Sequence, residues 1–263
     1  MLISSPQNPR IKALKKLDKA SERREQGIFL IEGMRELCLA DGAGYEIVSL
    51  FICEEVLTSS ETYNLAMCKL ENTEIFEITK EVYESVAYRG TTEGVVCAAR
   101  PKTHVIDDLN LSENPLILVI EGVEKPGNLG AMLRTCDATA IDAVIVCDTK
   151  TDIYNPNVIR SSIGTLFTNQ IAIAPITEVV RYLKKNSIKT YAADPLGAEY
   201  YYQKDLSKPV AFVVGDEATG LSGQWMTEAD ERIRIPMQGR IDSLNVSVSA
   251  AVLLYEALRQ RTL

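Results

Sequence analysis

One stretch near the C-terminus is the most informative about the fold: Ile233-Arg-Ile-Pro-Met-Gln-Gly-Arg-Ile-Asp-Ser-Leu-Asn-Val-Ser-Val-Ser-Ala250. Its first residues have the pattern of a short strand that ends at Pro236, and a polar loop follows. A helix of small residues is predicted from Asn245 onward. Small side chains let a ligand or another helix come close to the backbone, so the stretch predicts a strand, a loop and a helix around a contact surface.

Two glycine-bearing turns upstream follow strand-like runs. The turn Glu121-Gly-Val-Glu-Lys-Pro-Gly-Asn-Leu-Gly130 opens a helix that carries Arg134, and Asn128 is placed to cap that helix. The turn Val213-Val-Gly-Asp-Glu-Ala-Thr-Gly-Leu221 has glycines where a ligand could approach the carboxyl end of a strand. Taken alone, the first turn is better explained by a plain capped helix with a surface arginine, and Glu217 by a charge at a helix start.

The order of strand-like and helix-like runs predicts an α/β protein of two domains. A chain of 263 residues lies near the upper limit for one core. Residues 1–100 read as a small α/β domain, with a helix at 8–25 and strands at 27–31, 47–53, 74–78 and 94–99. The polar stretch 101–114 is the predicted linker. Residues 115–263 alternate strands at 116–121, 143–147, 188–192 and 210–214 with helices at 128–139, 177–186 and 245–261, which indicates a mostly parallel sheet covered by helices.

Several classes of chemistry are disfavoured by what the sequence lacks. His104 is the only histidine, and we expect it to be solvated in the linker, so histidine-based catalysis is disfavoured. The six cysteines form no CxxC pair, and we expect no metal site. No apolar export signal precedes them, so we expect reduced cysteines and a cytoplasmic protein. The sequence also contains neither GxGxxG nor GxxxxGK[ST], which disfavours a dinucleotide-binding or P-loop site.

The net charge of −8 argues at first against a nucleic-acid binder. Its distribution changes that conclusion, because residues 1–26 carry +4, residues 27–114 carry −10 and residues 115–263 carry −2. The N-terminal segment is therefore a basic arm, and a local track for an RNA backbone is compatible with the overall acidity. A solvated helix face is an equally good explanation of the same lysines.

In their order along the chain, the three segments resemble the three motifs of the SpoU (TrmH-like) branch of the SPOUT RNA 2′-O-ribose methyltransferases. The first is Asn128 followed by Arg134, the second is Gly215-Asp-Glu217 with Gly220-Leu221, and the third is Ile235-Pro-Met237 with Ser243-Leu-Asn-Val-Ser247. The run Asn155-Pro-Asn-Val-Ile-Arg-Ser-Ser-Ile-Gly164 also looks like the family's. The runs Phe29-Leu-Ile-Glu-Gly-Met-Arg35 and Gly90-Thr-Thr-Glu-Gly94 resemble a ribosomal-protein-like substrate-binding domain.

The resemblance implies an α/β domain with a C-terminal trefoil knot, S-adenosylmethionine as cofactor, and a homodimer formed through the knot region. The cofactor-binding residues that it implies are Gly215, Glu217, Gly220, Ile235, Pro236, Met237, Leu244, Asn245 and Ser247. The catalytic residues that it implies are Asn128, Arg134, Glu217, Ser243 and Asn245. Because a guanidinium stays protonated, we expect Arg134 to bind a phosphate and to stabilise charge on the 2′-oxygen rather than to act as a base.

The expected partner is RNA. The residues predicted to contact it are Lys12, Lys15, Lys16, Lys19, Arg23, Arg35, Arg134 and Arg160, and Arg240 extends the same basic track. The ribosomal-protein-like front domain favours ribosomal RNA of the 23S type over tRNA. Two other functions remain open, a non-catalytic RNA-binding protein on the same scaffold and a small-molecule enzyme, and the second fits the front domain poorly.

Overall fold

A computed structural model of the chain describes residues 1–70, 72–88, 93–216 and 218–262, and these form two compact units. The first unit comprises Met1–Thr103 and Asp152–Thr168, and the second comprises His104–Thr151 and Asn169–Leu263. The predicted division near residues 101–114 does not anticipate that residues 152–168 belong with the first unit. Within the described residues, no helix is long and apolar enough to cross a membrane.

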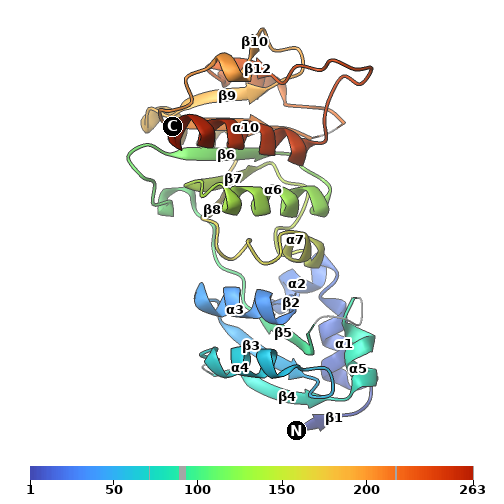
Figure 1. Ribbon diagram of the computed structural model, residues 1–263. Helices are drawn as coiled ribbons and strands as arrows, with labels where there is room; N and C mark the ends of the chain where they lie inside the picture. The colour runs from blue at the N-terminus through green and yellow to red at the C-terminus, as the bar shows by residue number, and fades with distance from the viewer. Residues whose placement is uncertain (71, 89–92, 217, 263) are drawn as a thin grey trace. The chain divides into compact units, whose positions relative to one another are not determined.

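The first unit is built on a mixed sheet with helices on both faces (Figure 1). Its strands are β1 (Leu2–Ile3), β2 (Phe29–Glu32), β3 (Ile47–Ile52), β4 (Glu74–Ile78) and β5 (Val95–Ala99). Their order is β1-β4-β3-β5-β2, and β5 runs antiparallel to both its neighbours. Its helices are α1 (Pro9–Lys16), α2 (Ala20–Gln26), α3 (Met34–Gly42), α4 (Ser59–Met67), α5 (Lys80–Val86) and α7 (Pro156–Ser161).

The predicted helix at 8–25 is wrong in one respect, because it is two helices. Ile11, Leu14 and Leu17 are buried as their spacing predicts. The guanidinium Nη1 of Arg23 donates to the carbonyl oxygens of Leu17 (2.6 Å) and Asp18 (2.9 Å) between the two helices. The chain turns at residues 17–19 and starts α2 at Ala20.

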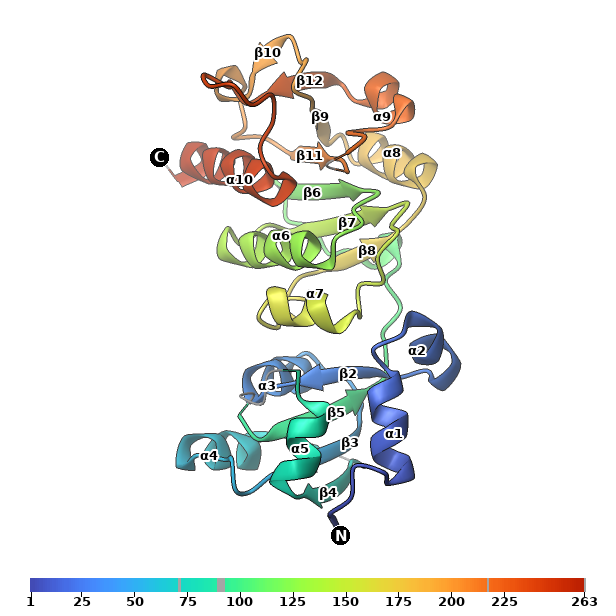
Figure 2. The ribbon, with the colours of Figure 1, turned by 90° about the vertical axis from the view of Figure 1, so that its right-hand side faces the viewer.

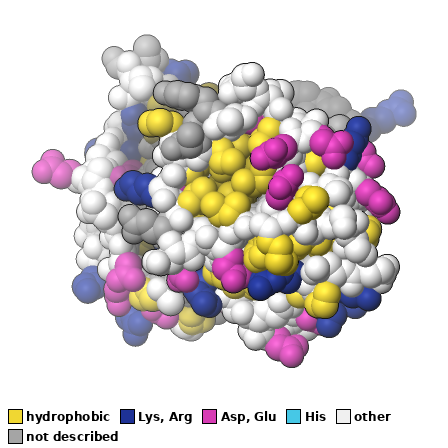
Figure 3. All heavy atoms as spheres, turned by 90° about the horizontal axis from the view of Figure 1, so that it is seen from below, with side chains coloured by type: hydrophobic (Ala, Val, Ile, Leu, Met, Phe, Trp, Pro, Cys, Tyr) yellow, Lys and Arg dark blue, Asp and Glu magenta, His cyan; other side chains and the backbone are white. Residues whose placement is uncertain are grey.

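Residues 152–168 complete an aromatic cluster in the first unit. The ring of Tyr154 lies 4.3 Å from that of Phe29, and the ring of Phe167 lies 5.0 Å from that of Tyr45, measured between centroids. All four side chains are buried. The same unit leaves apolar side chains exposed at and next to β1 and β4; they are Met1, Leu2 and Ile75. Figure 3 shows hydrophobic side chains gathered on the surface that is seen from below.

The second unit is a seven-stranded sheet in which every neighbouring pair is parallel, as the alternating pattern predicts. Its order is β10-β12-β9-β11-β6-β7-β8. The strands are β6 (Leu116–Glu121), β7 (Ala143–Cys147), β8 (Ile171–Ile173), β9 (Lys189–Ala193), β10 (Glu199–Tyr200), β11 (Val210–Val214) and β12 (Glu231–Arg234). Two 3-10 turns, η1 (Ile106–Asp108) and η2 (Tyr201–Gln203), lie outside the sheet.

Helices cover both faces of this sheet. They are α6 (Pro126–Ala138), α8 (Ile176–Lys185), α9 (Gly223–Glu228) and α10 (Val246–Thr262). Figure 2 shows α6 and α10 on one face and α8 and α9 on the other. All six residues of β6 are buried, as expected of a strand covered on both sides.

The prediction that His104 is solvated is corrected. His104 is half-buried rather than solvated, because its Nδ1 lies 3.1 Å from the carbonyl oxygen of Ile171 and its own carbonyl accepts the N–H of Ile173. Ile106, which follows in η1, is 2% exposed and joins the core of the second unit. The stretch is irregular as predicted, but it packs against β8.

Candidate active site

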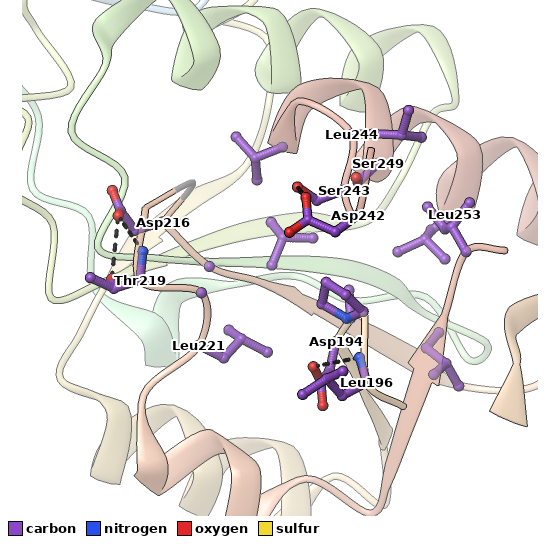
Figure 4. Close-up of a pocket in the computed structure, with 18 of the residues that line it drawn as sticks. Asp194, Leu196, Asp216, Thr219, Leu221, Asp242, Ser243, Leu244, Ser249 and Leu253 are labelled. Atoms are coloured by element: carbon purple, nitrogen blue, oxygen red, sulfur yellow. Dashed lines mark hydrogen bonds between the residues drawn. The ribbon is translucent and has the colours of Figure 1, made fainter. Parts of the chain in front are cut away.

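A cavity of about 560 Å³ lies at the carboxyl ends of three neighbouring strands, β9, β11 and β12 (Figure 4). Ligands of parallel α/β sheets bind at this edge. Ala193 ends β9 and Val214 ends β11, and both line the cavity. The remaining walls come from the loop after each strand and from the first turns of α10; they include Leu196, Gly220, Leu221, Ile235, Met237, Leu244, Ser249 and Leu253.

The loop after β11 is folded tightly on itself. A Cβ on Gly215 would lie within 2.4 Å of the carbonyl oxygen of Gly220, so glycine is required at position 215. The Oδ1 of Asp216 accepts the backbone N–H groups of Ala218 (2.9 Å) and Thr219 (3.1 Å). These hydrogen bonds hold the pKa of the Asp216 carboxyl below its ordinary value, and the bond from the Ala218 N–H has the largest effect. The Asp216 side chain is therefore charged at neutral pH.

The end of the same loop is fixed by a buried carboxylate. Glu121 is the last residue of β6 and is 6% exposed. Its Oε2 accepts the backbone N–H of Ser222, the N-cap of α9, at 2.9 Å. Because β6 and β11 are neighbouring strands, Glu121 ties the cavity loop to the centre of the sheet.

Asn245 joins the third loop to the first turn of α6. Its Oδ1 accepts the backbone N–H of Ser247 (3.0 Å) and the hydroxyl of Ser247 (2.6 Å), which caps α10. Its Nδ2 donates to the Oδ1 of Asn128 at 3.2 Å. Leu244 and Val246 on either side of Asn245 line the cavity, so the bonded pair lies at the cavity's edge.

The wall formed by the end of β9 contains an ion pair whose carboxylate is buried and whose guanidinium is partly exposed. Asp194 is 6% exposed, and its Oδ2 lies 2.8 Å from the Nε and 2.5 Å from the Nη2 of Arg232. Its Oδ1 accepts the N–H of Leu196 at 3.0 Å, which shapes the turn after the strand. Asp194 therefore lines the cavity with its charge balanced by a neighbour on β12.

The structure brings some of the predicted catalytic residues together. Asn128 and Asn245 are bonded, and Ser243 lines the cavity with its hydroxyl 3.2 Å from Asp242. Arg134 is exposed on α6 and is not part of the cavity wall. The expectation that Asn128 caps its helix is wrong, because α6 starts two residues earlier at Pro126. Glu217 lies outside the described residues.

The predicted cofactor-binding residues fall into two groups. Those that line the cavity are Gly215, Gly220, Ile235, Met237 and Leu244. Pro236, Asn245 and Ser247 are not part of its wall, although each is next to a residue that is.

One predicted RNA contact is corrected. Arg23 is 5% exposed, and its guanidinium pairs with Asp152 at 2.6 Å besides binding two backbone carbonyls, so it is a structural residue. Arg160 is only partly accessible, because it packs over the ring of Tyr88 (3.8 Å) and lies 3.4 Å from the Oε1 of Glu32. The other predicted RNA contacts are exposed, except Lys15, which is half-buried; the exposed ones are Lys12, Lys16, Lys19, Arg35, Arg134 and Arg240.

Asp194, Leu196 and Glu121 are functional-site residues that the sequence motifs do not predict. The signal for the first two was present, since Ala193-Asp-Pro-Leu-Gly197 follows a predicted strand at the edge where the other loops lie. Glu121 gave no such signal, because a carboxylate at a strand end is usually solvated and only the fold shows that it is buried.

Two family models match the chain. Residues 115–255 match the SpoU rRNA Methylase family, and residues 8–97 match the MRM3-like substrate binding domain. The first match covers more than half of the chain. It includes the loops after β9, β11 and β12 that line the cavity, and the pair Asn128 and Asn245 at the cavity's edge.

Individual proteins give the same result over the full length. The chain is 29% identical to the 23S rRNA guanosine 2′-O-methyltransferase RlmP of Bacillus subtilis, over 96% of this chain and 97% of the relative. It is 41% identical to a crystal structure of an RNA 2′-O ribose methyltransferase, with a TM-score of 0.88 and complete coverage of both chains. The complex of AviRb from Streptomyces viridochromogenes with AdoMet is 27% identical, with a TM-score of 0.88 over 97% of this chain and 99% of that one.

Proposed function

Because the chain belongs to the SpoU rRNA methylase family of S-adenosylmethionine-dependent RNA 2′-O-ribose methyltransferases, we propose that it methylates a ribose of 23S-type ribosomal RNA with the cofactor in the β9–β11–β12 cavity. The observation that carries this proposal is the Asn128–Asn245 hydrogen bond, which joins the first turn of α6 to the start of α10 at the edge of that cavity.

The cavity's residues fit S-adenosylmethionine. Leu196, Leu221, Ile235, Leu244 and Leu253 supply apolar walls for an adenine, and the loop at Gly215 presents backbone rather than side chain. Asp194, Asp216 and Asp242 supply negative charge, and within the described residues no Lys, Arg or His lines the cavity. This chemistry suits a ligand that carries a sulfonium and an ammonium group. When bound, S-adenosylmethionine supplies an electrophilic methyl group.

The chain's own residues would position the target ribose and stabilise the negative charge that develops on its 2′-oxygen. Asn128 and Asn245 hold the start of α6 against the start of α10, and Ser243 supports the loop before α10 through Asp242. The exposed guanidinium of Arg134 would bind a phosphate next to the target ribose and stabilise negative charge that develops on the 2′-oxygen. In this role Arg134 acts as a cation and a hydrogen-bond donor, because a guanidinium has no acceptor and stays protonated in proteins. Placing the ribose hydroxyl for in-line attack supplies several kcal/mol of the barrier reduction.

We also propose a homodimer and the family's knot. The three loops at Gly215, Ile235 and Leu244 meet around one cavity, which is compatible with a trefoil knot there. On α10, Val248 and Tyr255 are 47% and 51% exposed, and a second copy would cover such an apolar face. Sedimentation equilibrium of the wild type and of Tyr255→Glu tests the dimer; a monomeric wild type contradicts it.

The test of function is tritium transfer from labelled S-adenosylmethionine to 23S rRNA, 16S rRNA and tRNA, followed by mapping of 2′-O-methyl sites with and without the protein. We expect a single new site in 23S-type RNA. Transfer to tRNA alone would favour the tRNA alternative. RNA binding without transfer to any RNA would identify a non-catalytic binder.

A further inference from the structure

Three aspartates line the cavity, and they come from three different loops (Figure 4). Asp194 follows β9, Asp216 follows β11, and Asp242 lies in the loop before α10. Because the described part of the wall contains no cationic side chain, these carboxylates determine the sign of the potential inside.

The three carboxylates differ in how far their charge is already compensated. Asp194 is paired with the guanidinium of Arg232 through two of its nitrogens. Asp216 accepts two backbone N–H groups and the hydroxyl of Thr219 (3.3 Å), and it serves the turn of its own loop.

Asp242 is the exception. It is exposed, and the hydroxyl of Ser243 is its hydrogen-bond partner at 3.2 Å. Within the described residues Asp242 forms no ion pair, although Arg240 lies two positions before it. Its negative charge is therefore available to a ligand in the cavity.

We propose that Asp242 is a specificity-determining residue that favours S-adenosylmethionine over the product S-adenosylhomocysteine; this rests on the proposed cofactor site. In the reaction the ribose 2′-oxygen forms a bond to the methyl carbon. The bond between that carbon and sulfur breaks with its electron pair left on sulfur, and the hydroxyl proton leaves to water. The two ligands thus share adenosine and the amino-acid group and differ by one methyl and one positive charge at sulfur.

An uncompensated carboxylate attracts the charged ligand more strongly than the product. At a partly exposed site, a charge several ångströms away changes the ratio of the two dissociation constants by about fivefold. Asp242 therefore assists exchange of product for fresh cofactor.

The test is isothermal titration calorimetry of both ligands with the full chain, in the wild type, Asp242→Asn and Asp242→Glu. The matched control is Asp108→Asn, which makes the same charge change at an exposed position outside the cavity wall. We expect Asp242→Asn to weaken S-adenosylmethionine about fivefold and to leave S-adenosylhomocysteine within twofold. Asp242→Glu and Asp108→Asn should keep the wild-type ratio.

The remaining outcomes overturn the inference in different ways. Equal weakening of both ligands in Asp242→Asn would show that Asp242 only shapes the loop, and wild-type affinities for both ligands would show that its charge does not reach the cavity. If Asp242→Asn does not fold, loss of the ratio in Asp242→Glu contradicts the inference as well. A wild type that binds neither ligand refutes the proposed cofactor site itself, which separates the two failures.

Discussion

The side chain of Arg134 is exposed on α6, and within the described residues it forms no hydrogen bond or ion pair. Its charge is therefore available to RNA. A planar guanidinium can give two parallel hydrogen bonds to a phosphate, whereas a lysine is a compact point charge. The role that we propose thus depends on the shape of the side chain as well as on its charge.

Arg134→Lys should lower kcat about 100-fold, the usual cost of losing one charge-stabilising donor, and leave the affinity for S-adenosylmethionine within twofold. Single-turnover methyl transfer measures the first, and calorimetry measures the second. Arg181→Lys, an exposed arginine on α8, is the control and should retain full activity. Near-wild-type turnover in Arg134→Lys would exclude any role that needs a bidentate side chain.

Residue types alone could not distinguish the arginines. Arg23 and Arg134 are both arginines on predicted helices, yet Arg23 is buried against Asp152 and Arg134 is exposed. The partner of Arg23 lies 129 positions away in sequence, so no local pattern identifies it. Spacing correctly predicted the buried Ile11, Leu14 and Leu17, because burial of a helix face is a periodic property.

At the scale of elements, Asn245 has two separable tasks. It caps α10 through Ser247, and it bonds to Asn128 on α6. A serine can still cap a helix, but its shorter side chain does not reach across to Asn128.

Asn245→Ser should therefore keep the free energy of unfolding within about 0.5 kcal/mol and reduce activity at least tenfold. Asn245→Ala should lose about 1 kcal/mol as well, the usual value of a cap. Urea unfolding and tritium transfer measure the two effects. In a double-mutant cycle with Asn128→Ala, the losses of activity should not add, and additive losses would show that the bond has no role.

Glu121 connects two elements in the same way, from β6 to the start of α9. Glu121→Gln keeps an oxygen that accepts the Ser222 N–H, whereas Glu121→Ala leaves that donor without its partner at a cost of about 1–3 kcal/mol. We expect the KM for S-adenosylmethionine to rise about tenfold in Glu121→Ala, with a smaller change in kcat. In Glu121→Gln we expect the KM to stay near the wild-type value. Glu124→Ala, an exposed glutamate on the same turn, is the control. An equal defect in Glu121→Gln would mean that the charge, and not the hydrogen bond, is needed.

Strands were predicted better than helix boundaries. The runs 116–121, 143–147, 74–78 and 210–214 coincide with β6, β7, β4 and β11. Buried parallel strands are continuous apolar runs, so they are visible in sequence. Short elements such as β1, β10 and α9 were missed, because two to six residues contain too little of a period.

At the scale of the whole molecule, the chain order and the units do not coincide. Residues 152–168 lie within the range that matches the SpoU family model, yet they pack in the first unit through Tyr154, Phe167 and the Arg23–Asp152 pair. Composition and polarity predict a linker at 101–114, but they carry no information on contacts between segments far apart in the sequence. The prediction of two domains thus needed the fold to show which segments build each one.

The charge distribution leads to a prediction about RNA binding by the intact protein. Because Arg23 is buried in an ion pair, the predicted RNA contacts that remain in the basic N-terminal segment are Lys12, Lys15, Lys16 and Lys19. Among the described ion pairs of these four lysines there is only that of Lys16 with Glu22, at 3.9 Å. Each phosphate neutralised on a single strand contributes about 0.7 to the slope of log K against log salt. Replacing all four by glutamine should weaken binding at low salt and reduce that slope by up to about 3. The control replaces Lys69, Lys184, Lys185 and Lys208, which are exposed elsewhere and bring the same change in net charge. If both sets reduce the slope equally, RNA responds to the protein's total charge and the N-terminal lysines form no track.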